Sequence, residues 1–278
     1  MSIHSRYRAG LWHPYQKPMY GVLLNPYHPL ARGLVGCWLF NEGGGNTVFD
    51  LSGHGNHGSL GGGTAGYCPT WTAVKFGSAL NFDGSNDYVD CGNHESLNIT
   101  DEITIEAWVK TSTLQTNKYI VSKPKTETGS NGWDLNTGDS DNKLRIITSG
   151  ISPWSFQVDA NIYDGVCHHL IGEYDGTKHY IYIDGALIDS QDATGSIETN
   201  ANNLYIGRLS NYGLYFNGTI ALVRIYNRGL SSKEIWQLYT DPFCMFYHPL
   251  EAELLYAAAP PAGIVPQAMH HYYMLREV

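Results

Sequence analysis

The sequence has little charge and no basic cluster. Charged residues make up 15% of the 278 residues, lysine and arginine total 17, and the formal net charge is −9. No long run of lysine or arginine occurs anywhere in the chain. Binding to a phosphate backbone needs clustered positive charge. We therefore expect no nucleic-acid partner.

Cysteine is also scarce, and no apolar run is long. None of the five cysteines forms a CxxC pair, so zinc and redox motifs are not supported, and we expect mostly buried thiols. No stretch reaches the roughly 18 apolar residues of a membrane-spanning helix, so membrane insertion is not expected. The N-terminus carries Arg and Lys without an unbroken apolar segment, so no secretory signal is predicted.

The motifs of several enzyme classes are missing. The chain contains no GxSxG, HExxH or P-loop sequence. Glycoside hydrolysis needs two facing carboxylates, whereas Glu106 has only Thr104 and Trp108 as same-face neighbours on its predicted strand. We expect Glu106 to be a hydrogen-bonded edge or groove residue. His168 and His169 are adjacent on a strand, so they point to opposite faces and cannot chelate one ion together. These observations favour a protein that is not an enzyme.

Turn formers and strand formers are abundant instead. The chain has 31 glycines, which suit tight turns, and 20 tyrosines, which suit half-buried strands. Residues 103–110 alternate cleanly, with the apolar side chains of Ile103, Ile105, Ala107 and Val109 on one face. Residues 34–40 are apolar on both faces, which predicts a strand buried on both sides. Further strands are predicted at 79–82, 87–91, 119–122, 132–135, 144–147, 168–174, 178–183, 186–189, 204–207 and 218–226.

One helix is predicted near the C-terminus. Ser231 and Glu234 have the spacing of a capping box, and the helix runs from Ser232 to about Tyr239 before Asp241-Pro242 ends it. No helix-length amphipathic segment interrupts the strands, which excludes a parallel α/β sheet. Closely spaced strands of this kind indicate an antiparallel sandwich or barrel.

Several segments together resemble the laminin-G-like family of concanavalin A-like jelly rolls. They are residues 33–43, 50–58, 79–84, 103–109, 174–177, 182–185 and 223–231. The resemblance implies an all-β fold, a two-sheet antiparallel jelly-roll β-sandwich. We divide the chain into an N-terminal extended arm (1–31), the laminin-G-like sandwich (32–230), a short helix (231–240) and a C-terminal tail (241–278).

The resemblance also implies a calcium ion (Ca²⁺) in the glycine-rich loop 50–58, with Asp50, Ser52 and Asn56 as metal ligands. Hard cations take oxygen ligands, and glycines let a loop turn its carbonyls inward. An alternative is that Asp50 and Asn56 hold turns through hydrogen bonds to the backbone. Where the family often has an acidic residue before the 223–231 segment, this chain has Ala221, which removes one ligand.

Four aromatic residues are candidate ligand-binding residues. Trp133, Trp154, Tyr212 and Tyr215 lie in or beside predicted loops, where aromatic platforms and nearby amides would fit a glycan site. The alternative is that these rings pack against the loops of the sandwich rim.

The terminal segments are too apolar for solvated linkers. Surplus aromatic and aliphatic residues outside a closed domain usually cover their own domain or another chain. We expect a homo-oligomer, or contact with other virion or surface subunits. The predicted function is a non-enzymatic structural or adhesive protein, a virion decoration or fibre component located on the virion or an extracellular surface. A carbohydrate-binding module for a cell-surface glycan is the first alternative, and a glycoside hydrolase or polysaccharide lyase is the second.

Overall fold

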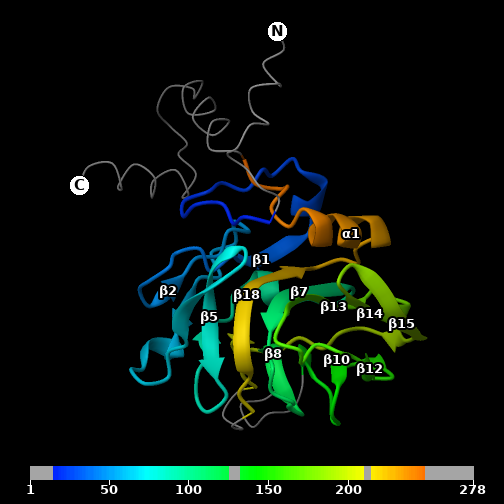
Figure 1. Ribbon diagram of the computed structural model, residues 1–278. Coiled ribbons are helices and arrows are strands. Elements are labelled where there is room, and N and C mark those ends of the chain that lie inside the picture. Colours follow the sequence, from blue (N-terminus) through cyan, green and yellow to red (C-terminus); the bar gives the residue numbers. More distant parts are fainter. Residues whose placement is uncertain (1–14, 125–131, 210–213, 248–278) are drawn as a thin grey trace.

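The computed structural model describes residues 15–124, 132–209 and 214–247. Two large antiparallel sheets pack face to face, and one α-helix lies near the C-terminal end of the described chain (Figure 1). The predicted fold class, an all-β jelly-roll sandwich, is confirmed. None of the helices in these three ranges is long and apolar enough to cross a membrane.

The first sheet has the strand order β15-β14-β13-β7-β18-β5-β4, and β1 also pairs with β18. Its strands are β1 (Leu34–Trp38), β4 (Thr70–Val74), β5 (Gly77–Asp83), β7 (Ile103–Lys110), β13 (Cys167–Tyr174), β14 (Lys178–Ile183), β15 (Ala186–Asp192) and β18 (Asn217–Tyr226). β7 and β18 lie in the middle of this sheet, so their backbones pair with a neighbouring strand on each side.

The second sheet has the strand order β12-β10-β9-β8-β17-β6-β3-β2. Its strands are β2 (Thr47–Val48), β3 (Gly58–Leu60), β6 (Val89–Asp90), β8 (Lys118–Lys123), β9 (Trp133–Thr137), β10 (Lys143–Thr148), β12 (Ser155–Asp159) and β17 (Tyr205–Ile206). A small pair, β11 (Ile151–Ser152) and β16 (Thr194–Gly195), stands apart. The helices are the 3-10 turns η2 (Pro29–Ala31), η3 (Gly61–Gly63) and η4 (Glu95–Leu97), and α1 (Ser232–Thr240).

Each predicted strand segment falls on an observed strand, and 103–110 and 178–183 match their strands end to end. The sequence analysis missed β2, β3, β4, β11, β12 and β16. Four of these strands are two or three residues long, too short for an alternating pattern to develop.

The main core lies between the two sheets. It contains the odd-numbered residues of β7 from Ile103 to Val109, as the alternation predicted, together with Trp38, Phe82 and Leu135. Burial of this apolar surface is the main stabilising force of the sandwich.

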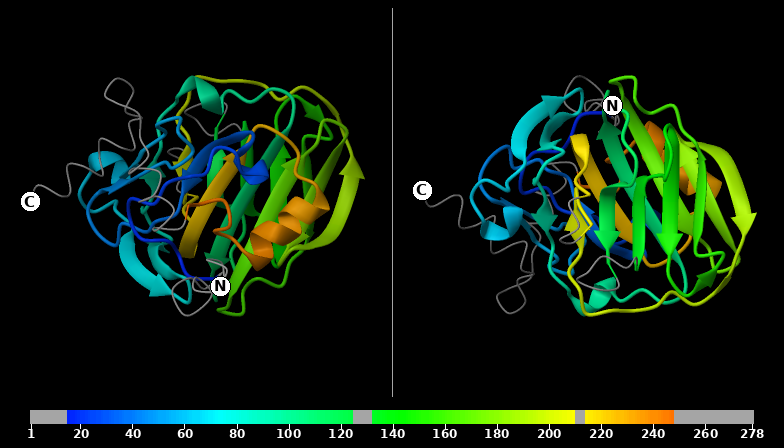
Figure 2. Two further views of the ribbon diagram at one scale, coloured as in Figure 1. Left: turned by 90° about the horizontal axis from the view of Figure 1, so that it is seen from above. Right: turned by 90° about the horizontal axis from the view of Figure 1, so that it is seen from below.

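A second apolar cluster covers the outer face of the first sheet. Trp108, Ile171 and Leu222 project from the sheet, and Leu238 of α1 and Phe243 pack on them. Figures 1 and 2 show the N-terminal segment and α1 lying across this face.

The two terminal segments also pair with each other on this face. The Asn25 amide donates to the Met245 carbonyl, and the Tyr247 amide donates to the Leu23 carbonyl, both at 2.9 Å. The described parts of the arm and the tail, residues 15–31 and 241–247, therefore cover the chain's own sheet. The sequence left two roles open for these apolar segments, covering their own domain or contacting another chain. The described parts have the first role.

A fully buried ion pair lies beneath this cover. Arg224 donates to both carboxylate oxygens of Glu106, at 2.8 and 3.0 Å, and to the Pro242 carbonyl. His169 Nε2 lies 3.3 Å from Glu106 Oε1. Burial alone would raise the pKa of Glu106, but the Arg224 guanidinium and His169 lower it. The expectation of an edge or groove position for Glu106 was wrong, because β7 pairs on both sides and the residue is fully buried.

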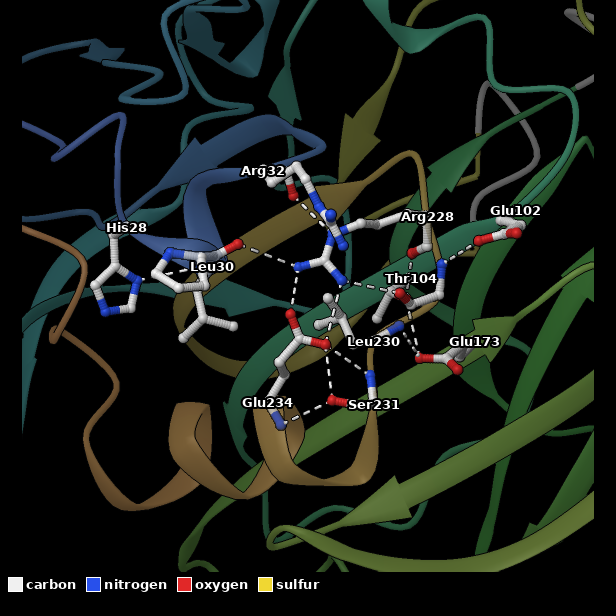
Figure 3. Close-up of polar contacts among 12 residues, drawn as sticks. His28, Leu30, Arg32, Glu102, Thr104, Glu173, Arg228, Leu230, Ser231 and Glu234 are labelled. Carbon is white, nitrogen blue, oxygen red and sulfur yellow. Dashed lines mark hydrogen bonds and ion pairs between the residues drawn. The ribbon is translucent and has the colours of Figure 1, made fainter.

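The predicted capping box of α1 is confirmed. The Ser231 hydroxyl accepts from the Glu234 amide at 3.4 Å, and Glu234 Oε2 accepts from the Ser231 amide at 2.9 Å. Arg228 donates to Glu234 Oε1 at 2.6 Å (Figure 3). These contacts fix the start of α1 to the end of β18.

A buried carboxylate ties the same segment to the sheet. Glu173 Oε2 accepts from the Leu230 amide and from the Thr104 hydroxyl, both at 3.0 Å (Figure 3). Burial raises the pKa of Glu173 to about 7, and these two donors only partly offset that effect. Glu173 thus accepts hydrogen bonds from uncharged groups, unlike Glu106.

Candidate functional site

The glycine-rich loop predicted to bind calcium is held together by Asp50. Its Oδ1 accepts from the amides of Cys37 (2.8 Å) and Ser52 (2.9 Å). Its Oδ2 accepts from the Ser52 hydroxyl (2.7 Å) and the Asn56 amide (3.0 Å). An ionised carboxylate has about four acceptor positions, so these contacts occupy them all.

Asn56 is a buried anchor of the same loop. Its Nδ2 donates to the Val35 carbonyl at 2.7 Å and to the Ser96 hydroxyl at 3.0 Å. Within the described residues, no group of three or more His, Cys, Asp or Glu side chains has an arrangement that could hold a metal ion. The contacts of Asp50 are those of a hydrogen-bonded turn, whereas Asn56 Oδ1 is buried and has no hydrogen-bond partner in the structure. Calcium at this loop stays a prediction from the family resemblance.

The four candidate aromatic residues are placed very differently. Trp133 is 1% exposed and packs in the core between the sheets, so the prediction of a ligand-binding ring there was wrong. It shares the inward-facing row of β9 with Leu135. Trp154 is 53% exposed and precedes β12. Tyr215 forms a bridge with Tyr119 of β8, and Tyr212 lies outside the described residues.

A row of hydrogen-bonding side chains crosses the outer face of the second sheet. Tyr119, Asn136, Arg145 and Gln157 stand opposite one another on β8, β9, β10 and β12. Arg145 donates through Nε to Asn136 Oδ1 at 3.0 Å and through Nη2 to Asn117 Oδ1 at 2.6 Å. We call this outer face the polar face. Its amides and guanidinium are held in fixed positions by one another.

Asp134, in the neighbouring row of β9, is a buried carboxyl without a cation directly bonded to it. Asn136 Nδ2 donates to its Oδ1, while its Oδ2 is buried and makes no hydrogen bond in the structure. Burial raises the pKa of Asp134 to about 8, and the amide of Asn136 and the charge of Arg145 only partly offset this. At neutral pH the group is therefore mostly a neutral acid, which can donate a hydrogen bond from its free oxygen.

A second group of side chains on the polar face is built around an arginine that lies between two tyrosine rings. The Arg208 guanidinium carbon lies 3.5 Å from the ring centre of Tyr88 and 4.1 Å from that of Tyr205. Contacts of this kind are cation–π interactions. Tyr67 adds a third ring, with its centre 6.4 Å from Tyr88. Burial raises the pKa of Tyr88, and the charge of Arg208 opposes this shift.

Asp90 and Asn203 complete this cluster. Asn203 Nδ2 donates to both carboxylate oxygens of Asp90, at 2.9 and 3.1 Å, and Asp90 stands opposite Tyr205 across β6 and β17. We call Tyr67, Tyr88, Asp90, Asn203, Tyr205 and Arg208 the tyrosine–arginine cluster. It combines aromatic rings with a carboxylate, an amide and a guanidinium.

The sequence analysis missed this cluster, although part of the signal was present. Tyr88 and Asp90 alternate with the apolar Val89 and Cys91, and Tyr205 stands between Leu204 and Ile206. Such alternation puts the polar side chains outward. The pairing of β6 with β17 brings together segments more than one hundred residues apart in sequence, and no local pattern indicates it.

Aromatic rings next to planar polar groups can bind a ligand that has both apolar faces and hydroxyl groups. Tyrosine and arginine are enriched at such recognition sites because they supply contact area and hydrogen bonds together. The tyrosine–arginine cluster is therefore the candidate binding surface of this β-sandwich.

Comparison with known proteins gives the family. A family model described as the concanavalin A-like lectin/glucanases superfamily matches residues 83–236. This match spans more than half of the chain, and the chain belongs to that superfamily. Among curated proteins, none matches the sequence.

Solved structures with the same fold include domains of larger proteins. The binding domain of Paraclostridial Mosquitocidal Protein 1 has a TM-score of 0.58 at 18% identity, over 77% of this chain and 53% of that one. Domain 4 of AbnA, an extracellular arabinanase from Geobacillus stearothermophilus, solved in complex with arabinotriose, has a TM-score of 0.57 at 20% identity, over 74% and 98%. Trypanosoma rangeli sialidase has a TM-score of 0.53 at 16% identity, over 77% of this chain and 33% of that one. The chain therefore spans about half of the toxin domain and a third of the sialidase.

Proposed function

We propose that the protein is a non-enzymatic, lectin-like domain that binds a glycan on the polar face, at the tyrosine–arginine cluster. The observation that carries this proposal is the Arg208 guanidinium held between the rings of Tyr88 and Tyr205, beside the Asp90–Asn203 pair. A pyranose or furanose ring can lie on a tyrosine while its hydroxyls bond to the carboxylate, amide and guanidinium. The arabinanase domain solved with arabinotriose has the same fold and supports this ligand class.

The side chains of the tyrosine–arginine cluster are held in fixed positions, which also supports the proposal that the cluster binds a glycan. Arg208 is 7% exposed and Tyr88 is 9% exposed, so their side chains are held before a ligand arrives. The Ser122 hydroxyl donates to the Arg208 carbonyl at 2.6 Å and fixes its backbone. A site that is already ordered loses less conformational entropy on binding.

We propose binding rather than catalysis because the acidic groups on the polar face are engaged by amides or by a cation. Asp90, Asp134 and Asp139 accept from amides, and Asp159 pairs with Lys143. Both oxygens of Asp90 accept from Asn203, and Asp134 accepts from Asn136. Glycosidases need a pair of carboxyl groups that face one another across the scissile bond. No two of these acids contact each other among the hydrogen bonds of the described residues.

The test is a glycan array that includes arabinotriose, followed by titration calorimetry on each hit. We expect binding by the full chain, and a loss of about tenfold or more in affinity for Tyr205→Ala and Arg208→Met. Tyr27→Ala is the matched control, because Tyr27 is 90% exposed on the N-terminal segment. No hit on the array, equal affinity of all variants, or release of shorter sugars from a bound glycan would contradict the proposal.

The setting that we propose is adhesion at a virion or other extracellular surface, with the chain assembled as a homo-oligomer or with other surface subunits. The support is the apolar and aromatic composition of residues 248–278 in the sequence. Residues 15–31 and 241–247 cover the chain's own sheet and do not contribute to this argument. Light scattering of the full chain at high concentration tests the assembly. A monomer under all conditions would contradict it.

A further inference from the structure

The edge strand β15 is the most exposed of the longer strands. Six of its seven residues are exposed, whereas no other described strand of five or more residues has more than two exposed residues. β15 forms one end of the first sheet, next to α1 (Figure 1). It contains no lysine, arginine or proline, the residues that commonly keep an open strand edge from pairing. β15 therefore presents an unprotected edge to solvent.

Three large apolar side chains are exposed around this edge. Leu187 is 48% exposed, Ile188 is 44% exposed and Trp236 of α1 is 55% exposed. Leu187 stands opposite Tyr182, which belongs to the apolar cluster of the outer face, so Leu187 projects from that face as well. A Cβ added at Gly185 would lie 3.0 Å from the Trp236 ring, which places this ring against the turn that leads into β15. We call Leu187, Ile188 and Trp236 the edge patch.

The backbone of Leu187 directs its hydrogen-bonding groups towards the open edge. The two turn residues before Ala186 have φ angles of 52° and 77°, as in the two-residue turn of a β-hairpin. Such a turn is closed by a hydrogen-bonded pair, here Ile183 and Ala186. Bonded and non-bonded pairs alternate in an antiparallel ladder, so the next pair, Tyr182 and Leu187, is non-bonded. The amide and carbonyl of Leu187 therefore face away from β14.

A second copy of the chain supplies a strand that matches this edge. In a two-fold symmetric antiparallel pair, each contact between the copies occurs twice. With the axis at Leu187, the two Leu187 side chains meet, and Ile188 of each copy lies opposite Ala186. This register keeps the two Asp189 carboxylates at opposite ends of the pair. With the axis at Asp189, the two carboxylates would face each other, which is unfavourable.

A bulge in β15 keeps the backbone pairing short. Ile181 and Tyr182 of β14 pair with Asp189 and Leu187, so Ile188 is an extra residue in β15. A bulge interrupts a regular ladder, which confines the backbone bonds between copies to the stretch around Leu187. The apolar side chains of the edge patch must supply the remaining contact. We therefore expect reversible association that depends on concentration.

We propose that the protein forms a two-fold symmetric dimer through β15, in which the edge patches of two copies pack against each other around Leu187. The inference rests on the assembly part of the proposed function, for which it names the contact surface. It does not depend on glycan binding, because the edge patch shares no residue with the tyrosine–arginine cluster. The axis of such a pair is perpendicular to the sheets, so both polar faces point to the same side of the dimer. Two ligands on one surface could then be bound at once, which raises the apparent affinity.

The first test is disulfide trapping with Leu187→Cys in the full chain. Directly opposed residues of an antiparallel pair have Cα atoms about 5.5 Å apart, within the range that a disulfide spans. Leu114→Cys is the matched control, because Leu114 is 54% exposed and lies outside the edge patch. The parent chain gives the background of the five native cysteines. Under mild oxidation we expect covalent dimers to form about tenfold or more faster in Leu187→Cys than in Leu114→Cys, with residue 187 linked to itself in the peptide mass spectrum.

The second test is analytical ultracentrifugation of the full chain over a range of concentrations. Leu187→Lys places a charge at the centre of the contact, and Trp236→Ala removes its aromatic ring. We expect each variant to raise the dimer dissociation constant about tenfold or more. Leu114→Lys should leave that constant unchanged. Because Leu187 and Leu114 are both exposed, the two lysine variants should keep the melting temperature of the parent.

The outcomes separate this proposal from the wider one. Self-association that is equal in the parent and Leu187→Lys would overturn the β15 contact and leave assembly through another segment. Trapping of Leu187→Cys no faster than that of Leu114→Cys would overturn it as well. A parent chain that is monomeric at all concentrations would overturn both the dimer and the assembly, whereas the glycan array would still decide the binding proposal.

Discussion

The outer faces of the two sheets have opposite chemistry. The outer face of the first sheet is apolar and covered, with Trp108 and Leu222 under the terminal segments and α1. The outer face of the second sheet is polar, with Arg145 and Asn136 in a row across the strands and Arg208 between tyrosine rings. In both sheets the inner face is apolar and forms the common core.

Both faces contain buried charged groups, but these groups have different partners. On the covered face, Arg224 and Glu106 satisfy each other directly and are fully buried. On the polar face, Asp134 Oδ2 and Arg208 Nε are buried atoms that have no hydrogen-bond partner in the structure. Buried polar atoms are nearly always hydrogen-bonded, so exceptions indicate a strained or functional position. Buried atoms without a hydrogen-bond partner also lie on the covered face, among them Arg224 Nε, Trp108 Nε1 and the Tyr226 hydroxyl. The two faces therefore differ in their apolar cover and not in how completely their buried polar atoms are bonded.

The largest effect should follow from breaking the ion pair under the cover. Arg224→Met leaves Glu106 buried without its cation, which costs about 3–5 kcal/mol of unfolding free energy. Urea unfolding of the full chain measures this loss. The double variant Arg224→Met/Glu106→Gln should recover most of it, because no charge is then left buried. Equal stability of the single and double variants would show that the pair is not the cause.

An intermediate effect should come from the covering segment itself. Met245 is fully buried in the second cluster, whereas Met19 is 79% exposed. Met245→Ala should cost about 2 kcal/mol, because it leaves a cavity that the terminal segment fills only partly. Met19→Ala is the matched control and should cost almost nothing. If both variants had the same stability, the tail would not pack on its own sheet in solution, and the contrast between the two faces would fail.

The sequence predicted those parts of this picture that depend on local patterns. Alternation located β7 and its two faces, and the capping box located the start of α1 at Ser231. The same alternation in β9 puts Trp133 on the inward side with Leu135, so its burial could have been foreseen.

The remaining features depend on which distant segments pair. Glu106 was expected at an edge, because a sequence does not tell which strands flank a given strand in a sheet. The tyrosine–arginine cluster needs the pairing of Tyr205 with Asp90, and the cover of the first sheet needs the contact between Asn25 and Met245. These contacts arise from packing of the whole chain and leave no periodic signal in either segment.

The smallest effect concerns Glu173, a buried carboxyl of the covered face that accepts hydrogen bonds from neutral groups. Burial raises the pKa of Glu173 to about 7, above the value of about 4.3 for an unfolded chain. The folded state therefore keeps the proton, and the stability that this contributes is present below about pH 4 and is lost as the pH rises towards 7. Glu173→Gln should thus become more stable than the parent by about 1 kcal/mol at pH 8 but not at pH 4.

Glu234 provides a control of opposite sign beside it (Figure 3). Although partial burial opposes the shift, Arg228 and Ser231 lower the pKa of Glu234 to about 2. Its charged form stabilises the fold at neutral pH, and this contribution is lost as the pH falls from about 4 to 2. Glu234→Gln should therefore be less stable than the parent at pH 7, with a difference that shrinks in acid. Thermal melts of the parent and both variants from pH 3 to 8 measure the two trends. Parallel curves for all three proteins would contradict the assignment of a neutral carboxyl to Glu173 and a charged one to Glu234.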